Sequence, residues 1–340
     1  MTVTSLFLAV AFTAMLVSGF LVPLLVRFAV GRNLMDLPNT RSSHKVPTPR
    51  LGGVAVITWT WAGFTVLYLM APEVGRETLP LVAAATVAGG VGLADDFVDL
   101  HFGVKAALQV VAVVGLLVVS PPPVLAAIPP GFGVGLLALG AFWVVALCNA
   151  FNFMDGIDGI TGGVTVISGL FLASIAGGTA GLLVALVGAM VGFLVWNIGP
   201  ATIFLGDAGS YFTGFALAVA VLYAPVGEGG VVVGLSGFIA GVVIFTPYLF
   251  DTGFTILRRL KSGAGSGVFT AHREHIYQRI TPEPAMHRRT SNIYYGLSAL
   301  CGFGALAASS GGGLRLVLGF GIAALCCALM LGLPRFADKS

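Results

Sequence analysis

Residues 134–161 read VGLLALGAFWVVALCNAFNFMDGIDGIT and contain the pattern on which the fold depends. The run 134–150 has no charged residue, and about 20 apolar residues cross a bilayer as a helix, fewer where protein shields the ends. Four polar residues then recur every three positions, which keeps them near one helical face or wraps them around one turn. They are Asn149, Asn152, Asp155 and Asp158. The stretch predicts a membrane helix with a polar cluster at one end.

The composition of the whole chain extends this pattern. Of its 340 residues 9% are charged and 57% are hydrophobic, whereas soluble globular chains carry about 25% charged residues. These values exclude a water-soluble protein and predict an all-α, polytopic integral membrane protein, with residues 1–340 in a single domain. The four cysteines lie in apolar stretches and suggest no disulfide framework, metal site or redox role.

Hydropathy predicts about eleven transmembrane helices. The candidates are residues 5–26, 51–71, 79–94, 104–120, 134–150, 162–177, 180–196, 208–225, 230–250, 292–308 and 314–333. The first is too long for the core of a signal peptide, so we expect it to be retained as a helix.

The distribution of charge predicts the orientation. With the N-terminus outside, the connections 27–50, 95–103, 151–161, 197–207 and 251–291 and the tail 334–340 share one side. That side, together with the helix ends that reach it, holds all five histidines, every Lys and Arg except Arg76 and Arg315, and every acid except Glu73, Glu77 and Glu228. An excess of Lys and Arg marks the cytoplasmic side. We therefore expect a cytoplasmic-face active site, with residues 251–291 as a cytoplasmic active-site loop.

Two acidic clusters interrupt the apolar sequence at predicted cytoplasmic helix ends. Asp95 and Asp96 occur in LADDFVDLH, and Asp207 in NIGPATIFLGDAGS is the sole charged residue between Ala201 and Glu228. Ionisable residues in membrane segments are costly and usually functional. The alternative is that these aspartates only cap helices.

A basic cluster, AHREHIYQR, lies in the long loop. It contains His272, Arg273, His275 and Arg279. Two histidines three residues apart provide phosphate donors or proton-transfer groups, although they lack the partners of a zinc site. The alternative is that the basic residues only mark the cytoplasmic side.

Together the clusters indicate phosphoryl chemistry at a membrane surface. Carboxylates and carboxamides without cysteine favour a hard cation, Mg²⁺ or Mn²⁺ in its place, and the basic groups favour phosphates. No P-loop or Rossmann glycine pattern occurs in the required context, which argues against a motor ATPase or a dehydrogenase. No nucleic-acid partner is expected.

In sequence order, these motifs resemble those of the polyprenyl-phosphate N-acetylhexosamine-1-phosphate transferases, the MraY/WecA/TagO superfamily. The resemblance runs from DLPNTRSSHKVPTPRLGG through LADDFVDL, NAFNFMDGIDG and NIGPATIFLGDAGS to the histidine loop. RSSHKVPTPRLGG and AHREHIYQR look closest to WbpL-type enzymes that initiate O-antigen synthesis. The chain lacks the consecutive histidines of MraY, which argues against a muramoyl-pentapeptide donor.

The resemblance implies a reaction at the bacterial inner membrane. A UDP-N-acetylhexosamine would give its sugar-1-phosphate to undecaprenyl phosphate and release UMP. The sugar would be GlcNAc or one of the 6-deoxy sugars QuiNAc and FucNAc. The lipid-diphospho-sugar would initiate O-antigen or other cell-envelope polysaccharide synthesis.

The resemblance also implies residue roles by position. Asp207 matches the Mg²⁺ ligand and Asn152 a carboxamide that helps it. Asp95 and Asp96 match the catalytic pair, with Asp95 orienting or deprotonating the lipid phosphate. Further catalytic groups would be His272 and His275. Substrate contacts would come from His44, Lys45, Arg50, Lys105, Asn149, Asp155, Asp158, Asn197, Phe204 and Arg279.

Two other classes of function compete with this interpretation. A transporter or channel would use the acids as an ion pathway, but its charges would lie near the bilayer midplane. A structural scaffold leaves the concentration of charge unexplained. The sequence leaves the sugar, a covalent intermediate and the oligomeric state open, although small residues on many spans would permit a homodimer.

Overall fold

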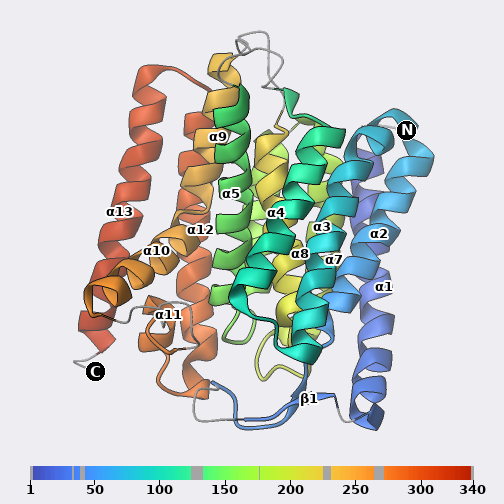
Figure 1. Ribbon diagram of the computed structural model, residues 1–340, viewed down its shortest axis with the longest axis vertical. Coiled ribbons are helices and arrows are strands. Elements are labelled where there is room, and N and C mark those ends of the chain that lie inside the picture. The colour runs from blue at the N-terminus through green and yellow to red at the C-terminus, as the bar shows by residue number, and fades with distance from the viewer. Residues whose placement is uncertain are drawn as a thin grey trace.

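The computed structural model describes residues 3–32, 34–38, 43–123, 133–175, 177–224, 231–263 and 272–337. These residues form a helical bundle with one small antiparallel hairpin, β1 (Met35–Asp36) and β2 (Thr48–Pro49) (Figure 1). The helices are α1 (Val3–Arg32), α2 (Gly52–Met70), α3 (Pro72–Val98), α4 (Phe102–Val119), α5 (Gly133–Met154), α6 (Ile160–Ile175), α7 (Ala180–Asn197), α8 (Gly206–Leu222), α9 (Val231–Ile244), α10 (Thr246–Lys261), α11 (Ile276–Arg279), α12 (His287–Ser309) and α13 (Gly313–Ala337).

Helix α8 forms the core of the bundle. Every residue from Ala208 to Val221 is buried, as expected for a helix that is apolar around its whole circumference. It packs against α3, α5 and α2. Its first turn carries Asp207, so the central helix presents an acid at one end of the bundle.

Glycines let the helices around Asp207 approach one another closely. A Cβ added at Gly92 of α3 would lie 2.1 Å from the carbonyl oxygen of Asp207. A Cβ added at Gly53 of α2 would lie 2.1 Å from the backbone nitrogen of Gly209. Small residues at helix interfaces allow such backbone contact in membrane proteins. The start of α8 is therefore held between α2 and α3.

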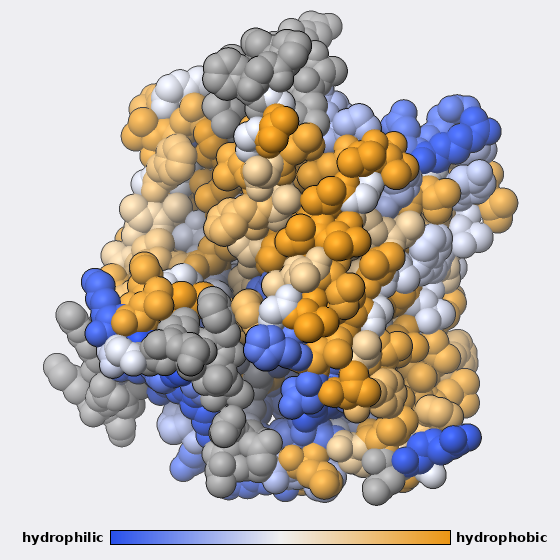
Figure 2. Space-filling model, viewed as in Figure 1, coloured by the Kyte–Doolittle hydropathy of each residue, from blue (hydrophilic) through white to orange (hydrophobic). Residues whose placement is uncertain are grey.

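The two ends of the bundle differ. The hairpin and α11 lie at the end opposite the N-terminus of α1 (Figure 1). The flanks carry exposed large hydrophobic side chains, such as Phe12, Leu24 and Phe28 along α1. Figure 2 shows apolar residues covering much of the helix flanks in this view, and hydrophilic residues gathered near the end that carries the hairpin and α11. This surface fits a bundle surrounded by lipid with a polar end.

The structure agrees with a multi-pass membrane protein. In the described part of the chain, seven helices are long and apolar enough to cross a membrane, or eight if the bent pair α9 and α10 counts as one span. Helices α6 and α8 are shorter and apolar. The expected total of eleven spans stays a prediction.

Several expected boundaries differ from the structure. The span expected at 230–250 is bent by 68° between α9 and α10, where Pro247 in the first turn of α10 lacks a backbone N–H. The connection 95–103 begins late, because α3 continues to Val98 and places Asp95 and Asp96 in its last turn. The loop 251–291 is helical at both ends, since α10 extends to Lys261 and α12 begins at His287.

Candidate active site

A cavity of about 230 Å³ opens among the segments that bear the sequence motifs. Four segments contribute to its wall: the first basic segment, the DGIDG turn, the loop before α8 and the histidine loop. The lining residues are Asp36, Ser43, His44, Arg50, Asp155, Gly156, Ile157, Asp158, Asn197, Phe204, Leu205, Gly206, Asp207, Arg273, Gln278 and Thr281. Folding thus brings together motifs that are up to about 240 positions apart, from residue 36 to residue 281.

Backbone hydrogen bonds join the PTPRLGG segment to the loop before α8. The N–H of Phe204 donates to the carbonyl of Pro49 at 2.8 Å, and the N–H of Gly52 donates to the carbonyl of Phe204 at 2.9 Å. The N–H of Gly53 donates to the carbonyl of Leu205 at 2.7 Å. These bonds fix the position of Phe204 in the cavity wall.

Asp96 holds the start of α8. Its two carboxylate oxygens accept hydrogen bonds from the backbone N–H groups of Asp207 and Ala208, each at 3.1 Å. A carboxylate is stabilised there by free N–H groups and the helix dipole. Gly206 has φ +71°, and an added Cβ would lie 2.9 Å from Asp96 Oδ2. Asp96 therefore caps α8 rather than the helix that follows it in the sequence, and this cap places Asp207.

Asp95 lies beside Asp207 and is paired with a cation. The side chains of Asp95 and Asp207 are close neighbours. Lys105 Nζ donates to Asp95 Oδ2 at 2.6 Å, and the N–H of Leu100 donates to Asp95 Oδ1 at 2.7 Å. Asp99 is exposed and ends α3 with φ 48°. The structure thus joins Asp95, Lys105 and Asp207, and leaves Asp99 outside the cluster.

The four polar residues of NAFNFMDGIDG separate in space. Asn149 is buried between helices, where its amide donates to Gln109 Oε1 at 2.6 Å, and it does not line the cavity. Asn152 donates to Ser210 Oγ at 3.1 Å and so lies one helical turn from Asp207. Asp155 and Asp158 line the cavity. Burial raises the pKa of Asp155 to about 7, and the charge of Asp96 acts in the same direction.

One wall of the cavity combines an aromatic ring with hydrogen-bonding groups. Phe204 meets the His44 ring edge-on, with centroids 4.8 Å apart. Asn197 accepts from the N–H of Gly159 at 3.0 Å and donates to the carbonyl of Ile203 at 2.9 Å. Arg50 lines the cavity and donates to Asp36, whose other oxygen lies 3.8 Å from His44 Nε2. Lys45 is exposed and lies outside the wall.

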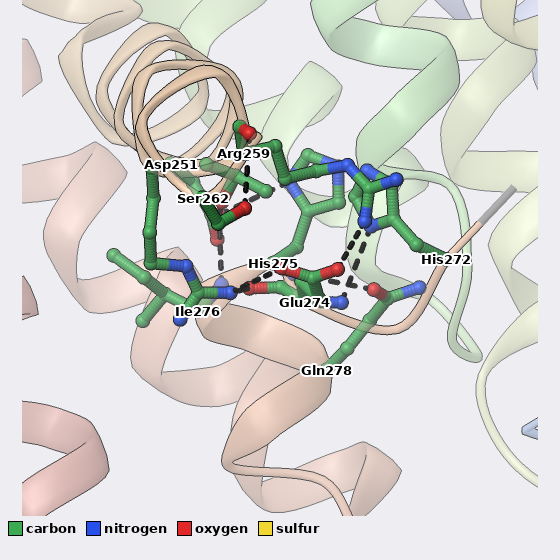
Figure 3. A network of polar contacts seen from close by, with 10 residues as sticks. Asp251, Arg259, Ser262, His272, Glu274, His275, Ile276 and Gln278 are labelled. Atoms are coloured by element: carbon green, nitrogen blue, oxygen red, sulfur yellow. Dashed lines mark hydrogen bonds and ion pairs between the residues drawn. The ribbon is translucent and has the colours of Figure 1, made fainter. Parts of the chain in front are cut away.

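The histidine loop is built around the buried carboxylate of Asp251 (Figure 3). Asp251 accepts from the N–H groups of Ile276 at 2.8 Å and Tyr277 at 3.0 Å, and from the hydroxyl of Tyr294 at 2.5 Å. His275 Nδ1 lies 3.1 Å from the same carboxylate. This buried acid therefore ties α10 to α11 and α12.

The predicted histidines lie behind the cavity rather than in its wall. His275 is 4% exposed and is engaged with Asp251. The His272 ring stacks on it with centroids 5.0 Å apart. Burial, with His275 and Arg259 nearby, lowers the pKa of His272 to about 4, so His272 is neutral at physiological pH. The loop instead presents Arg273, Gln278 and Thr281 to the cavity, while Arg279 is exposed outside it.

A second set of ion pairs fixes the end of α10 to this loop. Arg258 donates to the carbonyl and carboxylate of Glu274 at 2.8 and 3.1 Å, and Arg259 donates to the other carboxylate oxygen. Figure 3 shows Glu274 between Arg259 and the loop backbone. The basic residues of α10 thus order the histidine loop, in addition to any effect on orientation.

We expect Asp251→Asn to lower the melting midpoint by roughly 5 °C and turnover at least about tenfold, because an amide cannot accept from all these donors and turns its own NH₂ toward one of them. Differential scanning fluorimetry and a turnover assay measure both effects. Thr255→Val is the control, since Thr255 makes the longest bond to Asp251, at 3.4 Å, and should change little. Wild-type stability in Asp251→Asn would contradict the anchoring role.

The residues fit a Mg²⁺ ion completed by substrate. Among the described residues, no group of three or more His, Cys, Asp or Glu side chains is arranged to hold a metal. Mg²⁺ commonly binds one or two protein carboxylates together with substrate phosphates. Asp207 in the cavity wall would provide a hard oxygen donor for such a site, and Asn152 contacts Ser210, which lies about one turn after Asp207 on α8. Arg50 and Arg273 would provide cationic partners for phosphates.

Sequence reasoning missed several cavity residues. Ser43 donates to the carbonyl of Gly156, and Asp36 pairs with Arg50. Both lie inside or next to the basic motif of the first loop, which was the available signal. Gln278 lies inside the AHREHIYQR motif but was not singled out there, and Thr281 lies outside every motif. The place of both residues in the wall depends on how Asp251 folds the histidine loop.

A bundle of apolar helices with a polar cavity at one end, lined by carboxylates and arginines, defines an integral membrane enzyme for phosphorylated substrates. Comparison with known proteins identifies the family. Residues 78–224 match glycosyl transferase family 4. Over 302 residues the chain is 31% identical to the decaprenyl-phosphate N-acetylglucosaminephosphotransferase of Mycobacterium tuberculosis (strain ATCC 25618 / H37Rv), covering 79% of this chain and 74% of that protein.

Two further relatives agree. Identity is 27% to the "Probable undecaprenyl-phosphate N-acetylglucosaminyl 1-phosphate transferase" of Bacillus subtilis (strain 168), over 85% of this chain and 81% of that protein. It is 28% to the undecaprenyl-phosphate alpha-N-acetylglucosaminyl 1-phosphate transferase of Thermotoga maritima, over 72% of each chain. The chain therefore belongs to the polyprenyl-phosphate N-acetylhexosamine-1-phosphate transferases of the MraY/WecA superfamily.

Proposed function

We propose that the protein transfers N-acetylhexosamine-1-phosphate from a UDP-sugar to undecaprenyl phosphate and releases UMP. The observation that carries the proposal is the convergence of Asp207, Asp95 and Lys105 beside a cavity with an aromatic wall and two arginines. Family membership supports the reaction class, and the names of the relatives favour GlcNAc as the sugar. A transporter has less support, because the charged residues meet at one end of the bundle.

Each part of the UDP-sugar donor is assigned to a group of residues in the cavity wall. Phe204 would stack on uracil, with Asn197 and Asp158 as polar contacts around the nucleoside. Arg50 and Arg273 would bind the diphosphate, since a guanidinium donates to phosphate oxygens in a paired geometry. Gln278 and Thr281, in the histidine loop, would then face the sugar and distinguish a 6-hydroxyl from a 6-methyl group.

The reaction needs charge neutralisation and alignment more than covalent chemistry by the protein. An oxygen of the lipid phosphate attacks the β-phosphorus of the donor, and the bond from that phosphorus to the bridging oxygen breaks to release UMP. Asp95 would orient or deprotonate the lipid phosphate, while Lys105, paired with Asp95, would face the incoming anion. When bound, Mg²⁺ or Mn²⁺ would neutralise charge on the diphosphate and the leaving UMP. Asp207 and Asn152 would hold it.

The proposed setting is the bacterial inner membrane. The cavity would face the cytoplasm, where UDP-sugars are made, and the N-terminus would lie outside. The basic residues near the cavity, such as Arg258 and Arg259, support this orientation by the positive-inside rule. The product would initiate O-antigen or another envelope polysaccharide, and a homodimer is compatible with the many small residues on the helices.

We expect the purified protein to release UMP when given undecaprenyl phosphate, Mg²⁺ and one donor from UDP-GlcNAc, UDP-GalNAc, UDP-QuiNAc and UDP-FucNAc. EDTA should reduce turnover at least about 100-fold, and excess Mg²⁺ should restore it, because the protein alone offers too few ligands to retain the ion. Mass spectrometry of the lipid product identifies the sugar. Undiminished turnover in EDTA would refute the metal assignment, and folded protein inactive with every donor would refute the reaction.

A further inference from the structure

One face of α12 supports the DGIDG turn from behind the cavity. His287, Ser291 and Tyr295 are spaced four residues apart and so lie on the same helical face. The hydroxyl of Ser291 donates to the carbonyl of Asp158 at 2.8 Å, and that of Tyr295 donates to the carbonyl of Gly159 at 2.6 Å. His287 contacts the side chain of Asp158. This helix lies outside the residues 78–224 that match the family.

The Asp158 carboxylate is held on both sides. Its Oδ2 accepts from the N–H of Ala201 at 3.0 Å, and its Oδ1 lies 3.3 Å from His287 Nδ1. A Cβ added at Gly199 would lie 2.8 Å from Oδ2, so the chain leaves no room on that side. The side chains of Asp158 and His287 are 12% and 4% exposed, which makes their contact stronger than it would be in water. Asp158 lines the cavity and His287 does not.

His287 contacts both the backbone and the side chain of Asp158 through one ring nitrogen. Its Nδ1 accepts a hydrogen bond from the backbone N–H of Asp158 at 3.4 Å and lies 3.3 Å from Asp158 Oδ1. Its Nε2 is buried without a hydrogen-bond partner among the described residues. Nδ1 is therefore the atom through which the ring holds Asp158.

We propose that His287 is a positioning residue for the donor site. Its Nδ1 accepts from the backbone N–H of Asp158 and lies against the Asp158 carboxylate, so that the free surface of the carboxylate faces the nucleoside end of the cavity. The inference rests on the proposed function, in which Asp158 contacts the donor. Because His287 acts through Asp158, its loss should weaken binding of the donor in the ground state and transition state alike. Such a change raises KM with little change in kcat. The lipid acceptor should be unaffected.

The test compares substitutions that keep or remove the hydrogen-bond acceptor at the position of Nδ1. His287→Leu should raise KM for the UDP-sugar at least about tenfold, with kcat and KM for undecaprenyl phosphate within about threefold of wild type. Direct binding of UMP, measured by calorimetry, should weaken by the same factor. His287→Asn should return the donor KM to within about threefold of wild type, because its amide oxygen lies near the position of Nδ1 and accepts from the same N–H. Asn292→Ala is the matched control, because Asn292 lies on the same helix but is exposed, and this variant should also stay within about threefold.

Specific outcomes would overturn the inference. Equal effects of His287→Leu and His287→Asn on the donor KM would show a packing role. A decrease in kcat alone, or an increase in KM for both the UDP-sugar and undecaprenyl phosphate, would show general damage. If His287→Leu does not accumulate as folded protein, His287→Gln replaces it in the test. The donor KM should rise by the same factor, because the Gln side chain is one bond longer and places its amide beyond the position of Nδ1. If the wild-type protein is active and the donor KM of His287→Leu equals that of wild type, this inference is overturned and the proposed function is not. A wild-type protein that neither binds nor releases UMP overturns the proposed function as well.

Discussion

Asp207→Asn should lower UMP release at least about 1,000-fold while the protein stays inserted and folded. The substitution replaces a carboxyl group by an amide at the start of α8, where Asp207 lies beside Asp95 and where the proposed metal would bind. Stabilisation of a transferring phosphoryl group by a bound metal contributes several kcal/mol, which corresponds to this factor. UMP release under saturating substrates is the measurement, with circular dichroism and the melting midpoint to establish folding.

Asp99→Asn provides the matched control for charge. Asp99 follows the same helix as Asp95, but it is exposed and lies outside the cluster. Asparagine tolerates the left-handed conformation, φ 48°, that residue 99 adopts, so the fold should not be strained. Turnover of this variant should stay within about twofold of wild type. Comparable activity in both variants would remove Asp207 from the catalytic site.

Gly92→Ala should have the second large effect, although Gly92 touches no substrate. The new Cβ would lie 2.1 Å from the carbonyl oxygen and 2.4 Å from the carbonyl carbon of Asp207, and backbone atoms cannot move aside as a flexible side chain would. Helix α3 must then shift from α8, and this shift separates Asp95 and Asp96 from Asp207. Displacements of about 1 Å at catalytic groups cost on the order of 100-fold in rate, and overpacking costs about 1–3 kcal/mol. We expect both losses.

Gly90→Ala separates crowding from a change in helix propensity. Gly90 lies two residues away on α3, and among the described residues no atom outside its own helix backbone and chain neighbours lies within 4 Å of a Cβ added there. Alanine favours a helix by up to about 1 kcal/mol over glycine, so this variant should be as stable as wild type or more stable, with unchanged turnover. Equal turnover and melting midpoints for the two variants would mean that α3 and α8 are not as closely packed as the structure indicates.

The sequence was most informative about the acids at helix ends. Charged residues are expensive near lipid, so Asp95, Asp96 and Asp207 stood out against the apolar background, and the structure brings these three together. The sequence did not indicate that the three aspartates make different contacts. Asp96 caps α8 with both oxygens, whereas Asp95 pairs with Lys105.

Equal spacing in the sequence was a poor guide to position within NAFNFMDGIDG. Helix α5 ends at Met154, so Asn149 and Asn152 follow helical geometry while Asp155 and Asp158 follow the turn. Asn149 consequently faces Gln109, away from the cavity. The histidine pair likewise lies outside the cavity wall. The buried Asp251 binds the histidine loop to α10, and Arg273 and Gln278 line the wall instead.

By itself the sequence determined the class of protein, an all-α membrane bundle, and the family to which it belongs, because hydropathy and short polar motifs are local properties of the chain. Only the tertiary structure decided which buried polar groups support the site. Asp251 lies at the edge of a predicted loop and His287 lies in a basic segment, so no sequence motif marks either residue. Each nevertheless contacts a segment more than 20 residues away. Such contacts depend on which helix faces meet, and that is set by close glycine packing and by the bend between α9 and α10 rather than by any local pattern.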